Sequence, residues 1–352
     1  MVISELPSES VLPLLKDTNT IAISSINYEN RSLKWLLDLP KDSFKAALKI
    51  LLLRSRSNNV ALLEQIKDSN VEQAKKQLNS LNTPFDFLRV EYPEGFDREL
   101  LKRTMTSLCD GCATPELNII LDITAIPRVI ILSFLEAIYE TQRLGKISPK
   151  LYITYTAASK YPHLEYPHEV GYLVTYFSNK RLHEFLKEGD YVNLVVVPSI
   201  YGFETRLLAE ELIRLNVHVR EFSVVIPFYK HNVLTSIEVL RMNPGVLPRL
   251  YSTYDCRLHF VFSIHDAMEM ILDLSNWDAR DEVCLIAPFN VKPLIVPAFC
   301  SCKHLFEKGI KRADIVRMSG IQYSSLYSYG AGEVTSWRVR FNAREDQSMQ
   351  GQ

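Results

Sequence analysis

Residues 20–31 read TIAISSINYENR, and residues 193–206 read NLVVVPSIYGFETR. In both segments an apolar run is followed by an aromatic-Glu-x-Arg element, so that Tyr28-Glu29-Asn30-Arg31 corresponds to Phe203-Glu204-Thr205-Arg206. The apolar runs are typical of buried strands, and a leucine-rich segment follows each arginine. The two segments indicate an internal repeat, which decides how the rest of the chain is divided.

Two further pairs of segments follow in the same order. Residues 121–128 (LDITAIPR) correspond to 286–293 (IAPFNVKP), and residues 153–161 (ITYTAASKY) correspond to 315–323 (IVRMSGIQY). The three pairs are offset by 175, 165 and 162 residues, which is about half of the 352-residue chain. Two related halves with insertions or deletions in their loops explain these offsets.

Apolar runs alternate with helical patterns through both halves, which predicts parallel strands joined by helices. The fold class predicted is α/β, with two tandem Rossmann-like, doubly wound parallel-sheet domains related by internal duplication. We expect an N-terminal domain at 1–178, a C-terminal domain at 188–340 and a flexible tail at 341–352. Residues 1–18 resemble an arm or a short helix. Strands are expected at 20–26, 49–54, 85–90, 118–123, 150–156, 193–198, 219–226, 257–261, 282–287 and 312–317.

Composition bounds the class of protein. The chain is 47% hydrophobic and 23% charged, which is typical of a globular protein, and its net charge of −1 gives no reason to expect broad nucleic-acid binding. No apolar run is long enough for a membrane helix and no signal-peptide layout is present, so we expect a cytoplasmic protein without a membrane partner. The six cysteines are interpreted as free thiols.

Several common sites are missing from the sequence. There is no Gly-x-Gly-x-x-Gly after the first strand, no P-loop and no Gly-x-Ser-x-Gly elbow. The usual nicotinamide dehydrogenases, P-loop NTPases and α/β-hydrolases are therefore excluded as classes for this protein. Cys109-x-x-Cys112 has zinc-ribbon or redox spacing, but the other close pair, Cys300-x-Cys302, has the wrong spacing to complete a metal site. We therefore predict neither a metal nor a cofactor.

Polar and aromatic residues of the repeated segments fall near the ends of expected strands. In a doubly wound sheet, ligands bind beyond the carboxyl ends of the strands, where loops and helix N-termini meet. We therefore predict that each half brings its own set together at one end of its sheet. In the first half the set is Glu29, Arg31, Thr124, Arg128, Tyr155 and Tyr161. In the second half it is Glu204, Arg206, Asn290, Lys292, Tyr323 and Tyr329.

The chemistry of these residues suits a phosphorylated nucleotide. Arg128 and Lys292 stand at expected helix starts, where backbone N–H groups already favour an anion. The guanidinium fork of Arg31 or Arg206 matches phosphate geometry, the glutamates accept hydrogen bonds from ribose or base edges, and tyrosine rings stack on bases. Structural alternatives stay open: ion pairs that fix the first loops, cations that only cover the helix starts, and tyrosines that pack between the halves.

On these polar loops, on Phe289-Asn290-Val291-Lys292 ahead of a helix and on the doubly wound layout, residues 19–336 resemble the Rossmann-like nucleotide-sensing domains of bacterial defence systems, such as the CRISPR-associated Rossmann fold. The resemblance implies binding of a cyclic or linear oligonucleotide between two Rossmann units, here supplied by one chain. Such sensors carry an effector domain, and the two halves leave no room for one. We therefore expect a separate effector protein as the partner.

Three functions follow as hypotheses. The first is a nucleotide-binding sensor or regulatory protein of an antiviral defence system. The second is a hydrolase or glycosidase acting on a nucleotide, with Glu29 or Glu204 paired with Asp122 as catalytic carboxyl groups. The third is a scaffold whose tyrosine-rich loops bind another protein.

Overall fold

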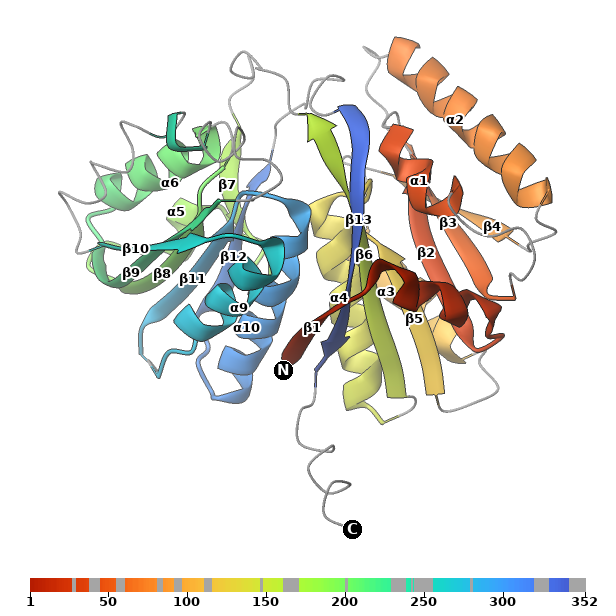
Figure 1. Cartoon of the computed structure of the whole chain (residues 1–352). Helices are drawn as coiled ribbons and strands as arrows, with labels where there is room; N and C mark the ends of the chain where they lie inside the picture. Colours follow the sequence, from red (N-terminus) through yellow and green to blue (C-terminus); the bar gives the residue numbers. More distant parts are fainter. Residues whose placement is uncertain are drawn as a thin grey trace. The chain divides into compact units, whose positions relative to one another are not determined.

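A computed structural model describes residues 1–26, 30–37, 45–54, 61–80, 85–91, 97–110, 116–145, 148–160, 171–199, 202–228, 239–241, 243, 256–278, 281–319 and 329–341. These residues form an α/β structure with one seven-stranded and one six-stranded sheet (Figure 1). The chain divides into two compact units, the first unit being Met1–Pro162 with Ser325–Gln352 and the second unit His163–Ser324. In the ranges given above, no helix combines the length and apolarity needed to cross a membrane.

The sheet of the first unit has the strand order β1-β13-β6-β5-β2-β3-β4. Its parallel strands are β2 (Thr20–Ile26), β3 (Ala47–Arg54), β4 (Phe85–Glu91), β5 (Glu116–Asp122) and β6 (Ser148–Lys160). Two antiparallel strands, β13 (Tyr329–Arg340) and β1 (Val2–Leu6), extend it beyond β6. Its helices are η1 (Ser8–Lys16), η2 (Asn30–Leu33), α1 (Lys34–Leu37), α2 (Ala61–Ser80), α3 (Arg98–Asp110) and α4 (Arg128–Arg143).

The sheet of the second unit has the order β10-β9-β8-β11-β12-β7. Its parallel strands are β8 (Tyr191–Val197), β9 (His218–Pro227), β10 (Cys256–Val261), β11 (Val283–Pro288) and β12 (Ala313–Ser319). The antiparallel strand β7 (Tyr172–Thr175) pairs with β12. The helices are α5 (Leu182–Phe185), α6 (Phe203–Arg214), α9 (Ile264–Leu274), η3 (Lys292–Leu294) and α10 (Ile295–Glu307).

The five parallel strands of the two sheets have the same order. In chain order, each sheet runs third, second, first, fourth, fifth, so its strand order reverses between the first strand and the fourth. The three pairs of repeated segments start in strands of equal rank: β2 and β8, β5 and β11, β6 and β12. The predicted α/β class and the ten predicted parallel strands are confirmed, with ends that differ by a few residues.

The two faces of the first sheet are covered by different helices. One core combines Ala22, Ile50 and Ile120 from the sheet with Trp35 of α1 and Leu78 of α2. Because right-handed crossovers to the two sides of β2 place their helices on opposite faces, α4 covers the face away from α2. The carboxyl ends of β2, β5 and β6 therefore meet between the two helical layers.

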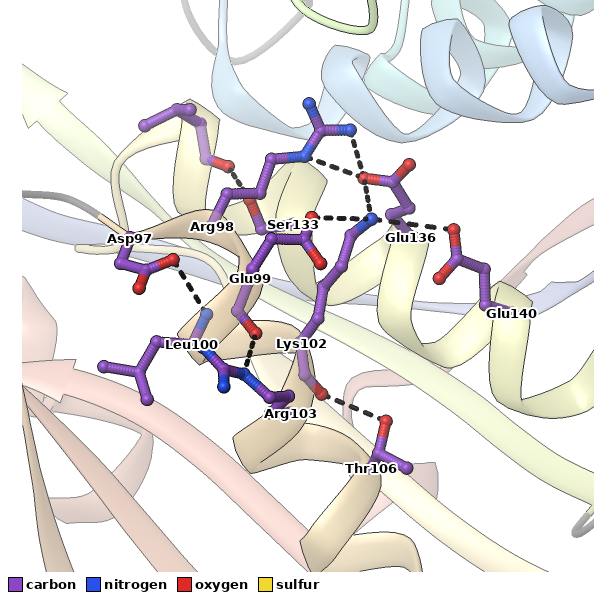
Figure 2. Close-up of polar contacts among 11 residues, drawn as sticks. Asp97, Arg98, Glu99, Leu100, Lys102, Arg103, Thr106, Ser133, Glu136 and Glu140 are labelled. Carbon is purple, nitrogen blue, oxygen red and sulfur yellow. Dashed lines mark hydrogen bonds and ion pairs between the residues drawn. The ribbon is translucent and has the colours of Figure 1, made fainter.

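Helix α4 is held in place by an ion network with α3, which Figure 2 shows. Arg98 Nε donates to Glu136 Oε2 over 3.0 Å, and Lys102 Nζ lies 3.2 Å from the same oxygen. Glu140 and Glu99 lie 3.6 and 3.5 Å from Lys102 Nζ. Glu136 is buried, so pairing with two cations offsets the cost of removing its charge from water. The network fixes the helix whose first turn borders the carboxyl edge of β5.

The observed domain division corrects the predicted one. Residues 325–341 belong to the first unit and not to a C-terminal domain at 188–340, because β13 pairs with β6 from Val339↔Leu151 to Tyr329↔Lys160. The second unit is thus inserted between two neighbouring strands of the first. Strand β7, placed by prediction in the first domain, belongs to the second. Pairing between segments about 180 residues apart leaves no local pattern, which explains the error.

Both ends of the chain also differ from expectation. The predicted arm contains strand β1, paired with β13, followed by the 3-10 helix η1. Phe341, assigned to the tail, is buried, and its ring packs edge-to-face on Tyr139 with centroids 5.6 Å apart. The rest of the predicted tail lies outside the described residues.

Candidate functional site

A row of buried polar side chains crosses the carboxyl end of the first sheet. Register pairs Asp122 of β5 with Thr154 of β6, and Thr154 with Ser336 of β13. Ser24 of β2 completes the row, since its hydroxyl donates to Asp122 Oδ2 over 2.7 Å. The four residues are 0–3% exposed. We call them the polar row, and it lies where the strand order reverses.

Asp122 is the centre of this row. Its Oδ1 accepts from the backbone N–H of Thr124 at 3.1 Å and from the Thr124 hydroxyl at 2.5 Å, while Oδ2 accepts from Ser24. A buried carboxyl group needs such donors because it has lost its hydration. The bond to a residue two positions later shapes the turn from β5 toward α4. Asp122 therefore holds strand β2 and the turn before α4 together.

Ser24 and Thr124 extend the contacts to neighbouring elements. The indole Nε1 of Trp35 in α1 donates to Ser24 Oγ over 3.1 Å, and the N–H of Thr156 in β6 donates to Thr124 Oγ1 over 2.9 Å. Each hydroxyl thus donates to Asp122 and accepts from another element. The result is a continuous hydrogen-bond network from α1 through β2 and β5 to β6.

Arg31 joins the network at β6. Only 3% of this residue is exposed, and its Nη1 donates to the Thr156 carbonyl at 3.1 Å and to the Tyr155 hydroxyl at 3.4 Å. Its Cζ lies 5.8 Å from the centroid of the Tyr155 ring. Arg31 belongs to η2, which contacts β2, β6 and β13. The repeated aromatic-Glu-x-Arg element is therefore anchored to the last parallel strand through its arginine.

The predicted first-half set is partly brought together. Arg31, Thr124 and Tyr155 meet through Thr156, and Arg128 is the first residue of α4, half-buried and four residues beyond Thr124. Tyr155 lies inside strand β6, within the strand predicted at 150–156, and is buried. Glu29 and Tyr161 lie outside the described residues.

The second unit places its predicted residues differently. Glu204 is buried in the first turn of α6, whereas the Arg206 side chain is 57% exposed and its Nε lies 3.2 Å from Glu210 Oε1 on the same helix. Residues two apart on a helix face different directions, which explains the separation. The element thus opens a helix here and is not a loop. The left-handed backbone at Gly202 (φ 75°) makes the turn into α6 possible.

Asn290 connects two loops of the second unit. Its Nδ2 donates to the Pro198 carbonyl over 2.9 Å, and its Oδ1 accepts from the Val291 N–H over 3.0 Å. This ties the end of β8 to the end of β11. Lys292 is the first residue of η3 and half-buried, and Tyr323 lies outside the described residues. Tyr329 opens β13, so it belongs to the first unit and not to the second-half set.

The second unit has apolar residues where the first has the polar row. Register pairs Val196 of β8 with Ala287 of β11, and the next strand contributes Val316. All three belong to one hydrophobic core cluster. Ala287 is the residue that corresponds to Asp122 in the repeat. The polar row is therefore a feature of the first unit.

Five residues of the network were missed by sequence reasoning: Ser24, Trp35, Thr154, Thr156 and Ser336. A signal was present at Ser24, because it and Ser25 are polar residues that interrupt a mainly apolar strand. Thr154 and Thr156, two apart on one strand, also point to a polar face. Ser336 had no such signal because β13 itself was not predicted.

The remaining candidate groups are the cysteines and the side chains that could hold a metal ion. Cys256, Cys284, Cys300 and Cys302 are free, and burial raises the pKa of the Cys284 and Cys300 thiols to about 12, which keeps them protonated and unreactive. Across the part of the chain that the structure describes, no group of three or more His, Cys, Asp or Glu side chains is placed to hold a metal ion.

No protein-family model matches the sequence, and no curated protein matches it. The chain is similar to several solved structures, including two that are matched over most of its length. The cytoplasmic domain of a prokaryotic cation chloride cotransporter is 13% identical, with a TM-score of 0.22, covering 85% of this chain and 94% of that one. A functionally unknown protein from Pseudomonas aeruginosa PAO1 is 10% identical, with a TM-score of 0.24, covering 86% and 93%. At these values neither carries an argument about this chain.

The two arginines of the repeat are expected to differ in their effect on stability. Replacing Arg31 with alanine removes a charged donor from buried acceptors and should lower the free energy of unfolding of the first unit by about 2 kcal/mol. Arg206→Ala removes only an exposed pair within one helix and should leave stability nearly unchanged. Urea unfolding followed by circular dichroism measures both, and equal losses would contradict the assigned difference.

Proposed function

We propose that this chain binds a phosphorylated nucleotide-type small molecule at the carboxyl edge of the first sheet and signals to a separate effector protein. The observation that carries the proposal is the network of Asp122, Ser24, Thr124 and Arg31, which joins three strands where the strand order reverses. Ligands of parallel α/β sheets bind at this position. Supporting the choice, the strand positions of the second unit that correspond to the polar row carry the apolar residues Val196, Ala287 and Val316.

We further infer that the two units are Rossmann-like, doubly wound domains that arose by internal duplication. The support is twofold. Both sheets share one order of five parallel strands, and three sequence pairs start in strands of equal rank. The loss of the polar row from the second unit, at Ala287 and its neighbours, then reflects divergence of one copy.

The start of α4 supports a phosphate-bearing ligand. This 16-residue helix has Arg128 as its first residue and no acidic residue in its first turn, so its N–H groups and the helix dipole favour an anion. In the second unit η3 and α10 follow the corresponding strand β11 and also have no acidic residue in their first turns, whereas α6, which follows β8, carries Glu204 there. We propose that α4 provides the phosphate contact of the first unit, close to Thr124.

Three hydroxyl groups near this edge are also relevant. Within the described ranges, Thr154 Oγ1, Thr156 Oγ1 and Ser336 Oγ are buried and have no hydrogen-bonding partner. Unsatisfied buried polar groups are uncommon in native proteins and call for an explanation. Their concentration on two paired strands beneath η2 supports a functional role for this edge over a purely structural one.

Catalysis is placed second to binding. An enzyme that uses Asp122 as an acid or base needs this carboxyl group to reach a substrate, and Asp122 is fully enclosed with both oxygens hydrogen-bonded. The position suits a residue that holds others in place. A glycosidase-type reaction would also need Glu29, which lies outside the described residues.

Nucleotide binding is tested on the full chain with AMP, ATP, cyclic dinucleotides and short linear oligoadenylates. A ligand at 100 times its dissociation constant should stabilise the protein by about 2.7 kcal/mol in thermal unfolding. Calorimetric titration should give one site per chain, and Arg128→Ala should weaken binding about tenfold through the loss of one phosphate contact. Chromatography of the mixtures should show no turnover.

Arg206→Ala is the matched control and should bind as the unaltered chain does. The proposal is wrong if none of the nucleotides binds, or if binding survives Arg128→Ala unchanged. Turnover of a bound nucleotide would favour the enzyme hypothesis instead.

A further inference from the structure

The second unit has polar groups of its own just beyond the end of β8. Ser199 is the second residue after this strand, at the carboxyl edge of the sheet, and the strand order reverses between β8 and β11. The Ser199 N–H donates to Thr205 Oγ1 of α6 over 3.0 Å, and the Ser199 carbonyl accepts from Asn243 Nδ2 over 3.1 Å. The start of α6 and Asn243 therefore meet at the position where parallel α/β sheets bind ligands.

Asn243 is fixed as a hydrogen-bond acceptor. Its Nδ2 donates to two backbone carbonyls, that of Ser199 and, over 2.6 Å, that of Val239, so both bonds set the orientation of the amide group. Among the residues that the structure describes, Asn243 Oδ1 and Ser199 Oγ have no hydrogen-bonding partner. The two residues are 0% and 2% exposed, and buried polar atoms are normally hydrogen-bonded. The cluster therefore lacks a donor.

Glu204 adds a carboxylate at the same edge. The buried stripe of α6 consists of Glu204, Thr205, Leu208, Ala209 and Leu212, and its three apolar members pack in the core of the second unit. Glu204 begins this stripe, so its side chain lies on the side of the helix that faces the sheet. The residue is 9% exposed, and within the described ranges its carboxylate has neither an ion pair nor a hydrogen bond. A buried carboxylate needs a partner because it has lost its hydration.

We propose that Ser199, Glu204 and Asn243 bind the primary ammonium group of a small organic cation. An ammonium group has three N–H donors and no acceptor, so it matches acceptors that lack a donor. Its positive charge pairs with the Glu204 carboxylate, and hydrogen bonds that involve charged groups are the stronger ones. The preference is opposite to the preference for an anion proposed for α4 in the first unit. The second unit is thus a binding unit with a ligand of its own, and this inference does not depend on nucleotide binding.

The test uses putrescine, a small diamine, titrated calorimetrically into the full chain without nucleotide. One site per chain is expected. Glu204→Gln keeps the size of the side chain but removes its charge, and should weaken putrescine binding about tenfold. Ser199→Ala removes one neutral hydrogen bond to the ligand and should weaken it about threefold. The matched control is Glu210→Gln, the same change at an exposed glutamate of α6, which should bind putrescine as the unaltered chain does.

Two other ligands separate charge from hydrogen bonding. Tetramethylammonium has the charge but no N–H donor, and ribose has hydroxyl donors but no charge, so neither should displace putrescine. The proposal is overturned if putrescine does not bind, if it binds Glu204→Gln equally well, or if either competitor displaces it. Should Glu204→Gln not fold, Ser199→Ala decides, because the Ser199 hydroxyl makes no bond within the described residues whose loss could unfold the chain. Arg128→Ala should leave putrescine binding unchanged, so the nucleotide site and the ammonium site fail separately.

Discussion

Trp337→Ala is expected to lower the free energy of unfolding of the first unit by about 3–5 kcal/mol, the usual cost of deleting a buried indole ring. Trp337 lies on β13, between β1 and β6, and is fully buried. Its Nε1 has no hydrogen-bonding partner among the described residues, so the loss comes from packing and not from a broken hydrogen bond. Although it lies only fifteen residues before Gln352, Trp337 belongs to the core of the N-terminal sheet.

Hydrogen exchange resolved by peptide measures this result. The protection of backbone amides against exchange should fall in β2 and β5, whereas the amides of β8 and β9 in the second sheet should keep their protection. Trp277→Ala, which removes a buried indole ring from the second unit, is the matched control and should give the opposite pattern. If Trp337→Ala weakened β8 and β9 and spared β2, the C-terminal strand would belong to the second domain after all.

Asp122→Ala is expected to cost about 3–5 kcal/mol, because it leaves the donors on Ser24 and Thr124 without their acceptor inside the protein. Asp122→Asn keeps the size but presents an N–H₂ group to hydroxyl donors, so it should cost less than alanine and still destabilise. Urea unfolding is followed by tryptophan fluorescence, to which Trp35, bonded through Nε1 to Ser24, contributes together with Trp277 and Trp337.

Glu116→Ala is the control for the Asp122 variants, because Glu116 lies on the same strand but is exposed. The free energy of unfolding of this variant should match that of the unaltered chain. One outcome would contradict the structural role assigned to Asp122. If Asp122→Asn left stability intact and abolished turnover of a nucleotide, the residue would be catalytic and not a holder of the β2–β5 edge.

Local sequence pattern predicted most of the elements because each is specified by neighbouring residues. The run at Thr20–Ile26 is apolar and β-branched, and it forms β2 with the predicted bounds. Pro127 precedes α4 with φ −60°, which suits the start of a helix. The three strands that were not predicted, β1, β7 and β13, are the ones that pair antiparallel at the sides of the two parallel sheets. Their positions depend on distant partners and not on their own periodicity.

The candidate site was predicted in part for the same reason. Arg31, Thr124 and Tyr155 were selected from the repeat, and they do meet. The same reasoning selected Arg206 and Asn290 in the second unit, but these two residues do not meet. Arg206 pairs with Glu210 on its own helix, and Asn290 connects two loops. A repeat indicates which positions are equivalent, but the burial of each position depends on what is packed against it.

The sequence by itself determined the alternation of strands and helices, the equal rank of the repeated segments and the edge at which polar residues gather, because these follow from periodicity along the chain. Only the tertiary structure decided that the last strand returns to the first sheet and that Ser24, Asp122, Thr154 and Ser336 form one row. The physical reason is register. Hydrogen bonding between strands that are about 100 to 180 residues apart selects which side chains become neighbours, and a shift of one residue would turn each of them to the other face of the sheet.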